Sequence, residues 1–247
     1  MYIHKHGNKN SPLVIILHPM GITGEKMYEF VGSKLGDCFV LSPDMGGHAC
    51  EKRPFSSSVA EAAALHKYLK EKEMTNISLL YGASLGAAAA LRLLKYDDMN
   101  IGAVYLDGAP VARLNIMMRN IFSPVLLWQK KMIVKNREKG IADFVERYGR
   151  DIAEHMADTF LMFDKESINN ISNACVVGNT PGISEEMQKR IWFDWGEKEL
   201  YTRTSKPLAE KLYPHSHLIV REGFGHCEYM AKENESYTAF ISSLISG

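Results

Sequence analysis

The sequence predicts an α/β protein with a doubly wound, mostly parallel β-sheet and a helical cap inserted after the strand that ends near Leu106. In the first 110 residues, short runs of apolar and β-branched residues alternate with segments of helical periodicity. Such alternation is typical of parallel strands joined by right-handed helical crossovers. Residues 111–186 show helical patterns without strand signals, which return near residue 190. We therefore expect a core of residues 1–110 and 187–247 and a cap of residues 111–186.

Each expected strand is a short apolar run, because the central strands of a parallel sheet are covered on both faces. The expected strands are 13–17, 38–41, 77–81, 101–106, 190–195 and 217–220. The expected core helices are 25–35, 58–72, 87–94, 206–212 and 228–246. The second of these begins with Ser58-x-x-Glu61, the pattern of a capping box. The expected cap helices are 112–120, 124–136, 141–148, 151–163 and 166–177.

Composition excludes several classes of partner. Lysine plus arginine equals aspartate plus glutamate at 29 each, and no basic stripe with interleaved aromatic residues occurs, so no nucleic-acid partner is expected. The first apolar run, 13–17, is too short for a signal peptide or a membrane span, so no membrane partner is expected. The four cysteines are scattered without a C-x-x-C motif, which favours reduced thiols and a cytoplasmic location.

The segment 77–94 carries the strongest chemical signal in the chain. An apolar strand leads into Gly82-Ala83-Ser84-Leu85-Gly86, and an alanine- and leucine-rich helix follows. Strand, G-x-S-x-G and helix together form a nucleophile elbow, which presents a serine hydroxyl at the carboxyl edge of a parallel sheet. Side chains at Gly82 and Gly86 would collide where strand and helix pass closely. The pattern predicts that Ser84 is a nucleophile.

A serine hydroxyl is a poor nucleophile, so it needs a general base and an acid that orients the base. His226 follows the strand 217–220 in a glycine loop, Gly223-Phe224-Gly225-His226, which would bring the imidazole to the edge of the sheet that carries Ser84. The acid is expected where the preceding strand ends, and Glu199 lies three residues beyond Gly196 there. We therefore predict His226 as the base and Glu199 as the acid.

These motifs resemble the α/β-hydrolase superfamily, in particular its small members with a helical cap. The motifs are His18-Pro19-Met20-Gly21, Pro43-Asp44, Gly82–Gly86, Trp195–Glu199 and Gly223–His226. The resemblance covers the core and leaves out the cap. It implies an α/β-hydrolase fold and the activity of a carboxylesterase-like serine hydrolase.

Two details of the resemblance concern the acid. The family pattern after this strand is usually G-x-x-D, and Glu199 stands in the place of the aspartate. Some relatives hold the acid one strand earlier, which makes Asp107 the alternative. Asp194 is a third candidate, although it lies within the expected strand rather than beyond it.

The tetrahedral oxyanion of an acyl transfer needs two preorganised N–H donors. One is expected to be the amide of Leu85, at the amino end of the elbow helix. The resemblance implies a second donor in the turn after Leu17. Pro19 has no N–H, so the amide of Met20 is the expected donor, and His18 is expected to support the turn structurally.

The expected reaction is hydrolysis of a small apolar carboxylic ester or thioester through an acyl-enzyme on Ser84. The same residues are compatible with cleavage of a C–C bond, a lactone or an amide, or with a non-catalytic protein that binds a small ligand. Most apolar cap residues are expected to pack the cap helices together and a minority to line a substrate pocket. The residues concerned are Met117, Met118, Trp128, Met132, Met156, Phe160, Met162 and Phe163.

No cofactor and no metal are expected. His4 and His6 would lie on one face of an extended strand, but the sequence shows no third ligand near them. Ordinary surface histidines are the favoured interpretation. The oligomeric state does not follow from the sequence.

Overall fold

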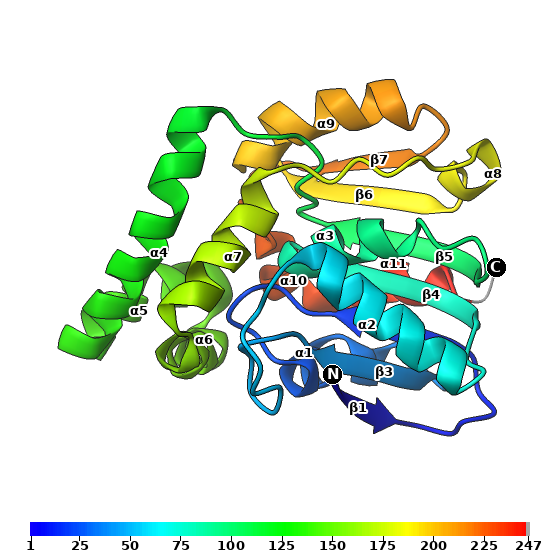
Figure 1. The fold of residues 1–247 in the computed structure, drawn as a ribbon, viewed down its shortest axis with the longest axis horizontal. Coiled ribbons are helices and arrows are strands. Elements are labelled where there is room, and N and C mark those ends of the chain that lie inside the picture. Colours follow the sequence, from blue (N-terminus) through cyan, green and yellow to red (C-terminus); the bar gives the residue numbers. More distant parts are fainter. Residues whose placement is uncertain (246–247) are drawn as a thin grey trace.

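A seven-stranded β-sheet forms the centre of the protein in the computed structural model, which describes residues 1–245 (Figure 1). The strand order is β1-β3-β2-β4-β5-β6-β7. β1 pairs antiparallel with β3, and all other neighbours are parallel, which confirms the predicted fold class. The strands are β1 (Tyr2–His6), β2 (Leu13–Leu17), β3 (Phe39–Asp44), β4 (Asn76–Ala83), β5 (Asn100–Asp107), β6 (Ile191–Gly196) and β7 (His217–Arg221).

Helices cover both faces of this sheet. α2 and α3 lie on one face, and α1, the short 3₁₀ helix η1 and α11 lie on the other (Figure 1). The helices of the core are α1 (Gly24–Phe30), η1 (Gly32–Lys34), α2 (Ser58–Glu71), α3 (Leu85–Leu93), α8 (Glu185–Gln188), α9 (Leu200–Leu212), α10 (Glu228–Lys232) and α11 (Asn234–Ser243). Among residues 1–245, no helix combines the length and the apolar character that a bilayer crossing requires.

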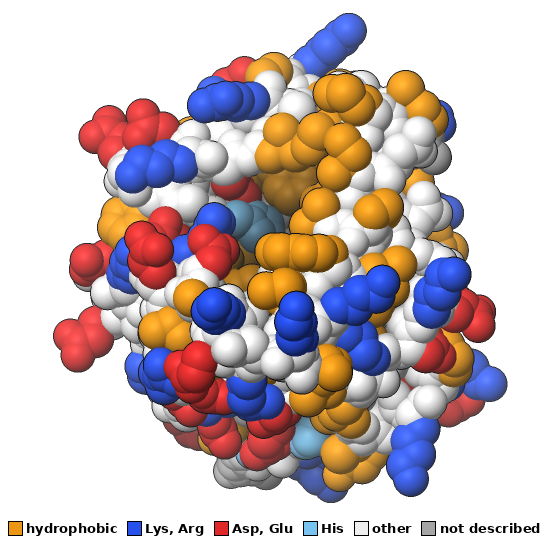
Figure 2. Space-filling view, turned by 90° about the vertical axis from the view of Figure 1, so that its left-hand side faces the viewer, with side chains coloured by type: hydrophobic (Ala, Val, Ile, Leu, Met, Phe, Trp, Pro, Cys, Tyr) orange, Lys and Arg blue, Asp and Glu red, His pale blue; other side chains and the backbone are white. Residues whose placement is uncertain are grey.

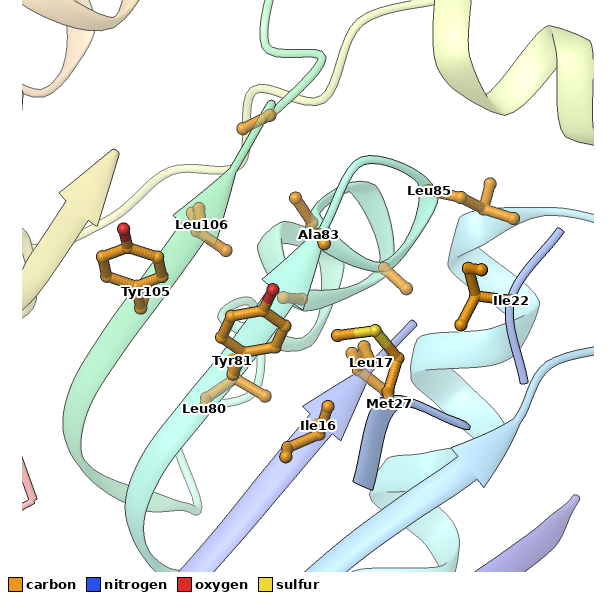
Figure 3. Packing of buried hydrophobic residues seen from close by; sticks show 14 of the residues in the cluster. Ile16, Leu17, Ile22, Met27, Leu80, Tyr81, Ala83, Leu85, Tyr105 and Leu106 are labelled. Atoms are coloured by element: carbon orange, nitrogen blue, oxygen red, sulfur yellow. The ribbon is translucent and has the colours of Figure 1, made fainter. Parts of the chain in front are cut away.

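The centre of the sheet is buried on both faces, as the apolar strand sequences predict. All five residues of β2 are buried. Figure 3 shows Leu17 of β2 and Tyr81 of β4 beside Met27 of α1. On the opposite face, the alanines of α3 allow this helix to pack closely on the sheet, and eight of its nine residues are buried. The rigid centre thus holds the carboxyl ends of β2 and β4 in fixed positions.

Of the five helices between β5 and β6, four lie together beyond one end of the sheet (Figure 1). They are α4 (Ile116–Lys135), α5 (Arg137–Tyr148), α6 (Arg150–Met162) and α7 (Lys165–Val176), which we call the helical insert. The two helices expected at 112–120 and 124–136 are wrong, because α4 continues through Pro124. Pro124 and Asn120 are both exposed, so water can bond the Asn120 carbonyl that loses its usual partner.

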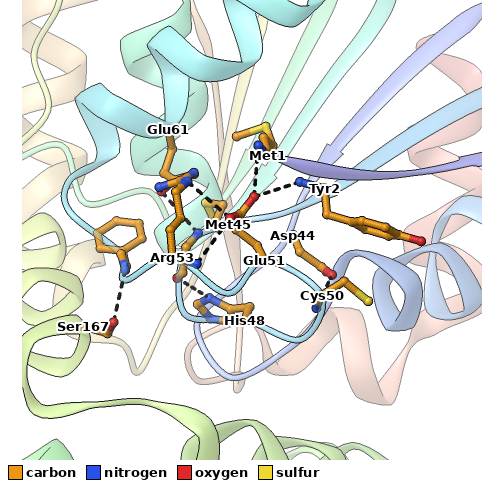
Figure 4. Close-up of polar contacts among 12 residues, drawn as sticks. Met1, Tyr2, Asp44, Met45, His48, Cys50, Glu51, Arg53, Glu61 and Ser167 are labelled. Atoms are coloured by element: carbon orange, nitrogen blue, oxygen red, sulfur yellow. Dashed lines mark hydrogen bonds and ion pairs between the residues drawn. The ribbon is translucent and has the colours of Figure 1, made fainter.

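The predicted capping box is also wrong. The N-cap of α2 is Ser57 rather than Ser58, and the Ser57 side chain accepts the backbone hydrogen bond. Glu61 instead accepts hydrogen bonds from the Gly46 amide and from the Arg53 guanidinium (Figure 4). Long-range contacts therefore fix the loop between β3 and α2, where the sequence suggested only a local motif.

Three core helices differ from their predicted bounds. The helix expected at 25–35 ends at Phe30, and the separate 3₁₀ helix η1 follows it. α9 begins at Leu200 rather than at residue 206 and contains Pro207. The single closing helix expected at 228–246 is divided into α10 and α11 at Glu233, whose backbone is not helical (φ = −118°, ψ = 43°). The side-chain amide of Asn234 donates to the carbonyls of Phe30 and Met230 at this point. Residue 246 of that prediction lies outside the described residues.

Candidate active site

The candidate site lies where the order of the sheet reverses. The chain places β3 on one side of β2 and then β4 on the other side. The loops that follow β2 and β4 therefore run in opposite directions and leave a crevice between them. Ligands of open α/β sheets bind at such switch points. A cavity of about 700 Å³ opens there, and its lining includes Met20, Ser84, Glu199 and His226. Figure 2 shows this face, where a histidine (pale blue) lies in a hollow bordered by hydrophobic side chains (orange).

The elbow has the local geometry that the glycines predict. Ser84 has φ = 51°, a left-handed backbone conformation that side chains rarely adopt, and its amide donates to the Asp107 carbonyl at 2.7 Å. A Cβ atom on Gly82 would lie 2.7 Å from the Gly86 carbonyl oxygen. A Cβ atom on Gly86 would lie 2.0 Å from the carbonyl oxygen of Leu17. The two glycines thus allow α3 to lie directly against β4 and the end of β2.

The structure brings Ser84, His226 and Glu199 together. His226 Nε2 lies 2.8 Å from Ser84 Oγ, and His226 Nδ1 is hydrogen-bonded to Glu199 Oε2. The other oxygen of Glu199, Oε1, accepts from the Gly196 amide at 2.8 Å, which fixes the carboxylate at the start of α9. With the proton on Nδ1 directed at Glu199, Nε2 can accept the serine proton, and the carboxylate then stabilises the imidazolium.

The surroundings of His226 favour its protonated form. Desolvation of the ring opposes protonation, but the charge and hydrogen bond of Glu199, together with the charge of Asp107, outweigh it. The pKa of His226 is therefore raised above the ordinary value of 6.5. A base with a raised pKa accepts the serine proton readily and loses its capacity as a base when the pH falls through that pKa.

Neither of the alternative acids, Asp107 and Asp194, is hydrogen-bonded to His226. Asp107 accepts a hydrogen bond from the Tyr237 hydroxyl at 2.8 Å. The Tyr237 hydroxyl is also hydrogen-bonded to the buried hydroxyl of Tyr81. Asp194 accepts from the Arg221 guanidinium at 2.7 and 2.8 Å. Burial, followed by repulsion from Asp194 and Glu199, raises the pKa of Asp107 to about 8. Glu199 is the one carboxylate of the three that is hydrogen-bonded to His226, so the geometry favours Glu199 as the acid.

Asp107→Asn is expected to change how stability depends on pH. Because the folded-state pKa of Asp107 is raised from 3.8 to about 8, the folded protein retains a proton that the unfolded chain loses in this window. Stability therefore falls as the pH rises from about 4 to about 8. Asparagine cannot ionise and can still accept from Tyr237, so Tm of the variant relative to wild type should rise by at least about 2 °C between pH 5 and pH 8.5. Parallel Tm profiles for the two proteins would contradict this.

The two predicted oxyanion donors lie at the start of α3 and in the turn after β2. Leu85 is the first residue of α3, so its amide has no acceptor within the helix. The Pro19 carbonyl accepts from His18 Nδ1 at 2.9 Å and from the Ile22 amide at 3.3 Å. Because the Pro19–Met20 peptide is planar, the Met20 N–H points away from these bonds. Within residues 1–245, neither the Met20 nor the Leu85 amide has an acceptor.

Sequence reasoning missed His48, whose ring lies against the ring of His18 between the loops after β2 and β3. His18 Nε2 accepts from the Met45 amide at 3.0 Å, and His48 Nε2 accepts from the Gly21 amide at 3.3 Å. The loops after β2 and β3 therefore hold each other through two neutral rings, whose centroids are 4.5 Å apart. Burial is the main cause that lowers the pKa of His18 to about 4 and the pKa of His48 well below 6.5. The only sequence signal for His48 was its place in a loop rich in turn residues.

The helical insert supplies the apolar wall of the cavity. This wall consists of Phe122, Val125, Leu126, Phe144, Ile152, Met156 and Phe160. Of the eight apolar cap residues expected either to pack or to line a pocket, Met156 and Phe160 line it. The expectation that most of the others pack inside the insert is wrong for Met117, Trp128 and Met162, which are exposed by 55–62%.

Comparisons with known proteins were made for both sequence and structure. No protein-family model matches the sequence, and no curated protein matches it. Many solved structures match the fold. Esterase EaEST from Exiguobacterium antarcticum has a TM-score of 0.76 at 16% identity, and the match covers 100% of this chain and 95% of that one.

Two further neighbours have the same architecture under different descriptions. An α/β hydrolase enzyme from a Medee basin deep-sea metagenome library has a TM-score of 0.76 at 15% identity, covering 100% of this chain and 94% of that one. Bromoperoxidase from Bacillus anthracis has a TM-score of 0.74 at 15% identity, covering 100% and 95%. At such identities a likeness establishes the fold rather than the reaction. The protein has the fold of the α/β-hydrolase superfamily, as its sequence motifs predicted.

Proposed function

We propose that the protein is a serine hydrolase that cleaves a small apolar carboxylic ester or thioester through an acyl-enzyme on Ser84. The observation that carries the proposal is the continuous hydrogen-bonded series from Ser84 Oγ through His226 to Glu199 in the lining of the cavity. The same three residue types in this geometry perform acyl transfer on several unrelated folds.

The reaction proceeds in two halves. Ser84 Oγ attacks the carbonyl carbon while His226 Nε2 takes the hydroxyl proton, and Glu199 stabilises the imidazolium. The amides of Met20 and Leu85 donate to the oxyanion of the tetrahedral intermediate. His226 then returns the proton to the leaving alcohol or thiol as the acyl-enzyme forms. A water molecule, deprotonated by the same nitrogen, releases the acid and restores Ser84. No step requires a cofactor.

The size and lining of the cavity support the substrate class. A volume of about 700 Å³ lies within the usual range of pockets for small molecules. We assign residues 111–186, which contain the helical insert, the role of a cap whose apolar residues receive the acyl or alcohol part. Polar side chains also line the cavity and can bind a polar group at one end of the substrate. They include Gln129, Arg147 and Lys198.

A fluorophosphonate probe is expected to label wild-type protein on Ser84, as detected by mass spectrometry of the peptide that contains it. The probe reacts only with a serine that a neighbouring base activates, so Ser84→Ala should not be labelled. Ser33→Ala is the matched control, because Ser33 is exposed and bonded to a helix carbonyl, and it should be labelled like wild type. Folded wild-type protein that remains unlabelled would favour a ligand-binding role without hydrolysis.

A further inference from the structure

His4 of the edge strand β1 lies beside acidic and thiol side chains from distant parts of the chain. β1 runs antiparallel to β3, with His4 opposite Ser42 and Tyr2 opposite Asp44. Directly opposite residues share a face of the sheet, and so do residues two positions apart. His4, Ser42 and Asp44 are therefore on one face. The sequence-based premise that His4 has no third ligand nearby is wrong, because β3 and the loop after it supply two candidate ligands.

Three donor atoms of different chemistry converge at this point. His4 Nε2 is 3.1 Å from Asp44 Oδ2, and the Cys50 thiol lies near both, so that the three ligand atoms are all within 4.8 Å of one another. The Cys50 amide donates to Asp44 Oδ2 at 3.1 Å, which holds the cysteine beside the carboxylate (Figure 4). Within residues 1–245, no other group of three or more His, Cys, Asp and Glu side chains converges in this way.

The charges around His4 leave a place for a cation. Asp44 is fully buried, and within the described part of the chain its one ion-pair partner is His4. His4 also lies 2.9 Å from Glu25 Oε2 through Nδ1, so both ring nitrogens face carboxylate oxygens. When Nδ1–H donates to Glu25, Nε2 is the ring nitrogen that can share a cation with Asp44 Oδ2.

The arrangement around His4 is one that metal sites use. A histidine ligand usually donates its second ring N–H to a carboxylate, which fixes the tautomer, and Glu25 is placed to accept it. Ser42 provides an independent observation, because its hydroxyl is fully buried and has no hydrogen-bond partner. It lies directly across from His4 on the same face. An unpaired buried hydroxyl is costly, so a metal-bound water or the metal itself is a natural partner for it.

We propose that His4 Nε2, Asp44 Oδ2 and Cys50 Sγ form a binding site for a divalent transition metal, with Zn²⁺ as the best match. Zinc accepts mixed nitrogen, oxygen and thiolate ligands in a tetrahedral arrangement at about 2.0–2.3 Å, whereas Mg²⁺ and Ca²⁺ prefer oxygen alone. The three atoms must move closer together to reach these distances, and the exposed position of Cys50 allows its side chain to do so. Cys50 also gives the ion access from solvent.

The site is independent of the proposed hydrolase chemistry. It joins β1 to the loop after β3, and the Asp44 carboxylate also accepts from the Gly24 amide at the start of α1 at 2.8 Å. A bound ion would therefore stabilise the folded protein by linking these three elements, since a ligand that binds only the folded state raises Tm.

Cobalt substitution tests the proposal directly, using reduced protein without a histidine tag. One equivalent of Co²⁺ should give wild-type protein a thiolate-to-cobalt charge-transfer band and intense visible bands of tetrahedral cobalt. Zn²⁺ should displace both and raise Tm. Cys50→Ser should lose the charge-transfer band, and His4→Gln should weaken Co²⁺ binding at least tenfold.

The matched control is His66→Gln, which removes a histidine paired with a surface aspartate, Asp98, and should behave like wild type. Each variant is first compared with wild type by Tm without metal, which separates loss of binding from loss of folding. A charge-transfer band that survives Cys50→Ser, or its absence from folded wild-type protein, would overturn the site. Neither result depends on whether the protein hydrolyses esters.

Discussion

Glu199→Gln is expected to lower kcat/KM for an activated acyl ester by about 10³–10⁴-fold, mainly through kcat. The glutamine amide carries no charge to stabilise the imidazolium, and its NH₂ group can hold His226 in the wrong tautomer. Because Glu199 raises the pKa of His226, the residual activity should also reach its plateau at a lower pH than wild-type activity. Rates from pH 5 to pH 9 with a nitrophenyl ester measure both effects.

Asp107→Asn is the matched control for Glu199→Gln. It removes a carboxyl of similar burial from the same edge of the sheet, but one that bonds Tyr237 rather than His226. We expect its kcat/KM to stay within about tenfold of wild type, since no hydrogen bond to His226 is lost. If Asp107→Asn proves the more damaging change, the proposed acid is Asp107, and the assignment of Glu199 falls.

The features that the sequence predicted well are those fixed by local chemistry. The strands β2 and β4 needed only continuous apolar runs, because both of their faces are covered. The elbow needed glycines on either side of Ser84. Gly82 lies against the backbone of Gly86 and Ala87 within the elbow, and Gly86 lies against the Leu17 carbonyl at the end of the neighbouring strand β2. Residues that follow consecutive parallel strands meet at one edge, so the order of serine, acid and histidine along the chain was enough to suggest which side chains converge.

The features that the sequence did not predict depend on contacts between distant segments. His4 and Asp44 are 40 positions apart and meet only because β1 pairs antiparallel at the edge of the sheet in one particular register. His48 is recognisable only when the loops after β2 and β3 are seen to bond each other. The sequence predicts a helix boundary at Pro124, but α4 continues through it. The exposed Asn120 carbonyl can bond water in place of the N–H that proline lacks. Each case depends on register or solvent access, which a residue pattern does not encode.

Gly86→Ala is expected to destabilise the protein by about 3 kcal/mol, the upper end of the range for overpacking, and to reduce kcat/KM by about 10²-fold. The added methyl group would lie 2.0 Å from the Leu17 carbonyl oxygen and 2.8 Å from the carbonyl oxygen of His18. These are backbone atoms, so the turn that carries the Met20 amide has to move. Chemical denaturation and ester kinetics measure the two effects.

Gly182→Ala separates the steric argument from the general effect of replacing glycine. A Cβ atom at Gly182 meets nothing within 4 Å, and no positive φ constrains the residue, so its stability should match wild type within about 0.5 kcal/mol. If Met20 supplies the second oxyanion donor, Gly86→Ala should lower kcat more than it changes KM, because that hydrogen bond strengthens only in the transition state. A variant that loses stability but retains kcat would contradict the assignment of Met20 as the second oxyanion donor.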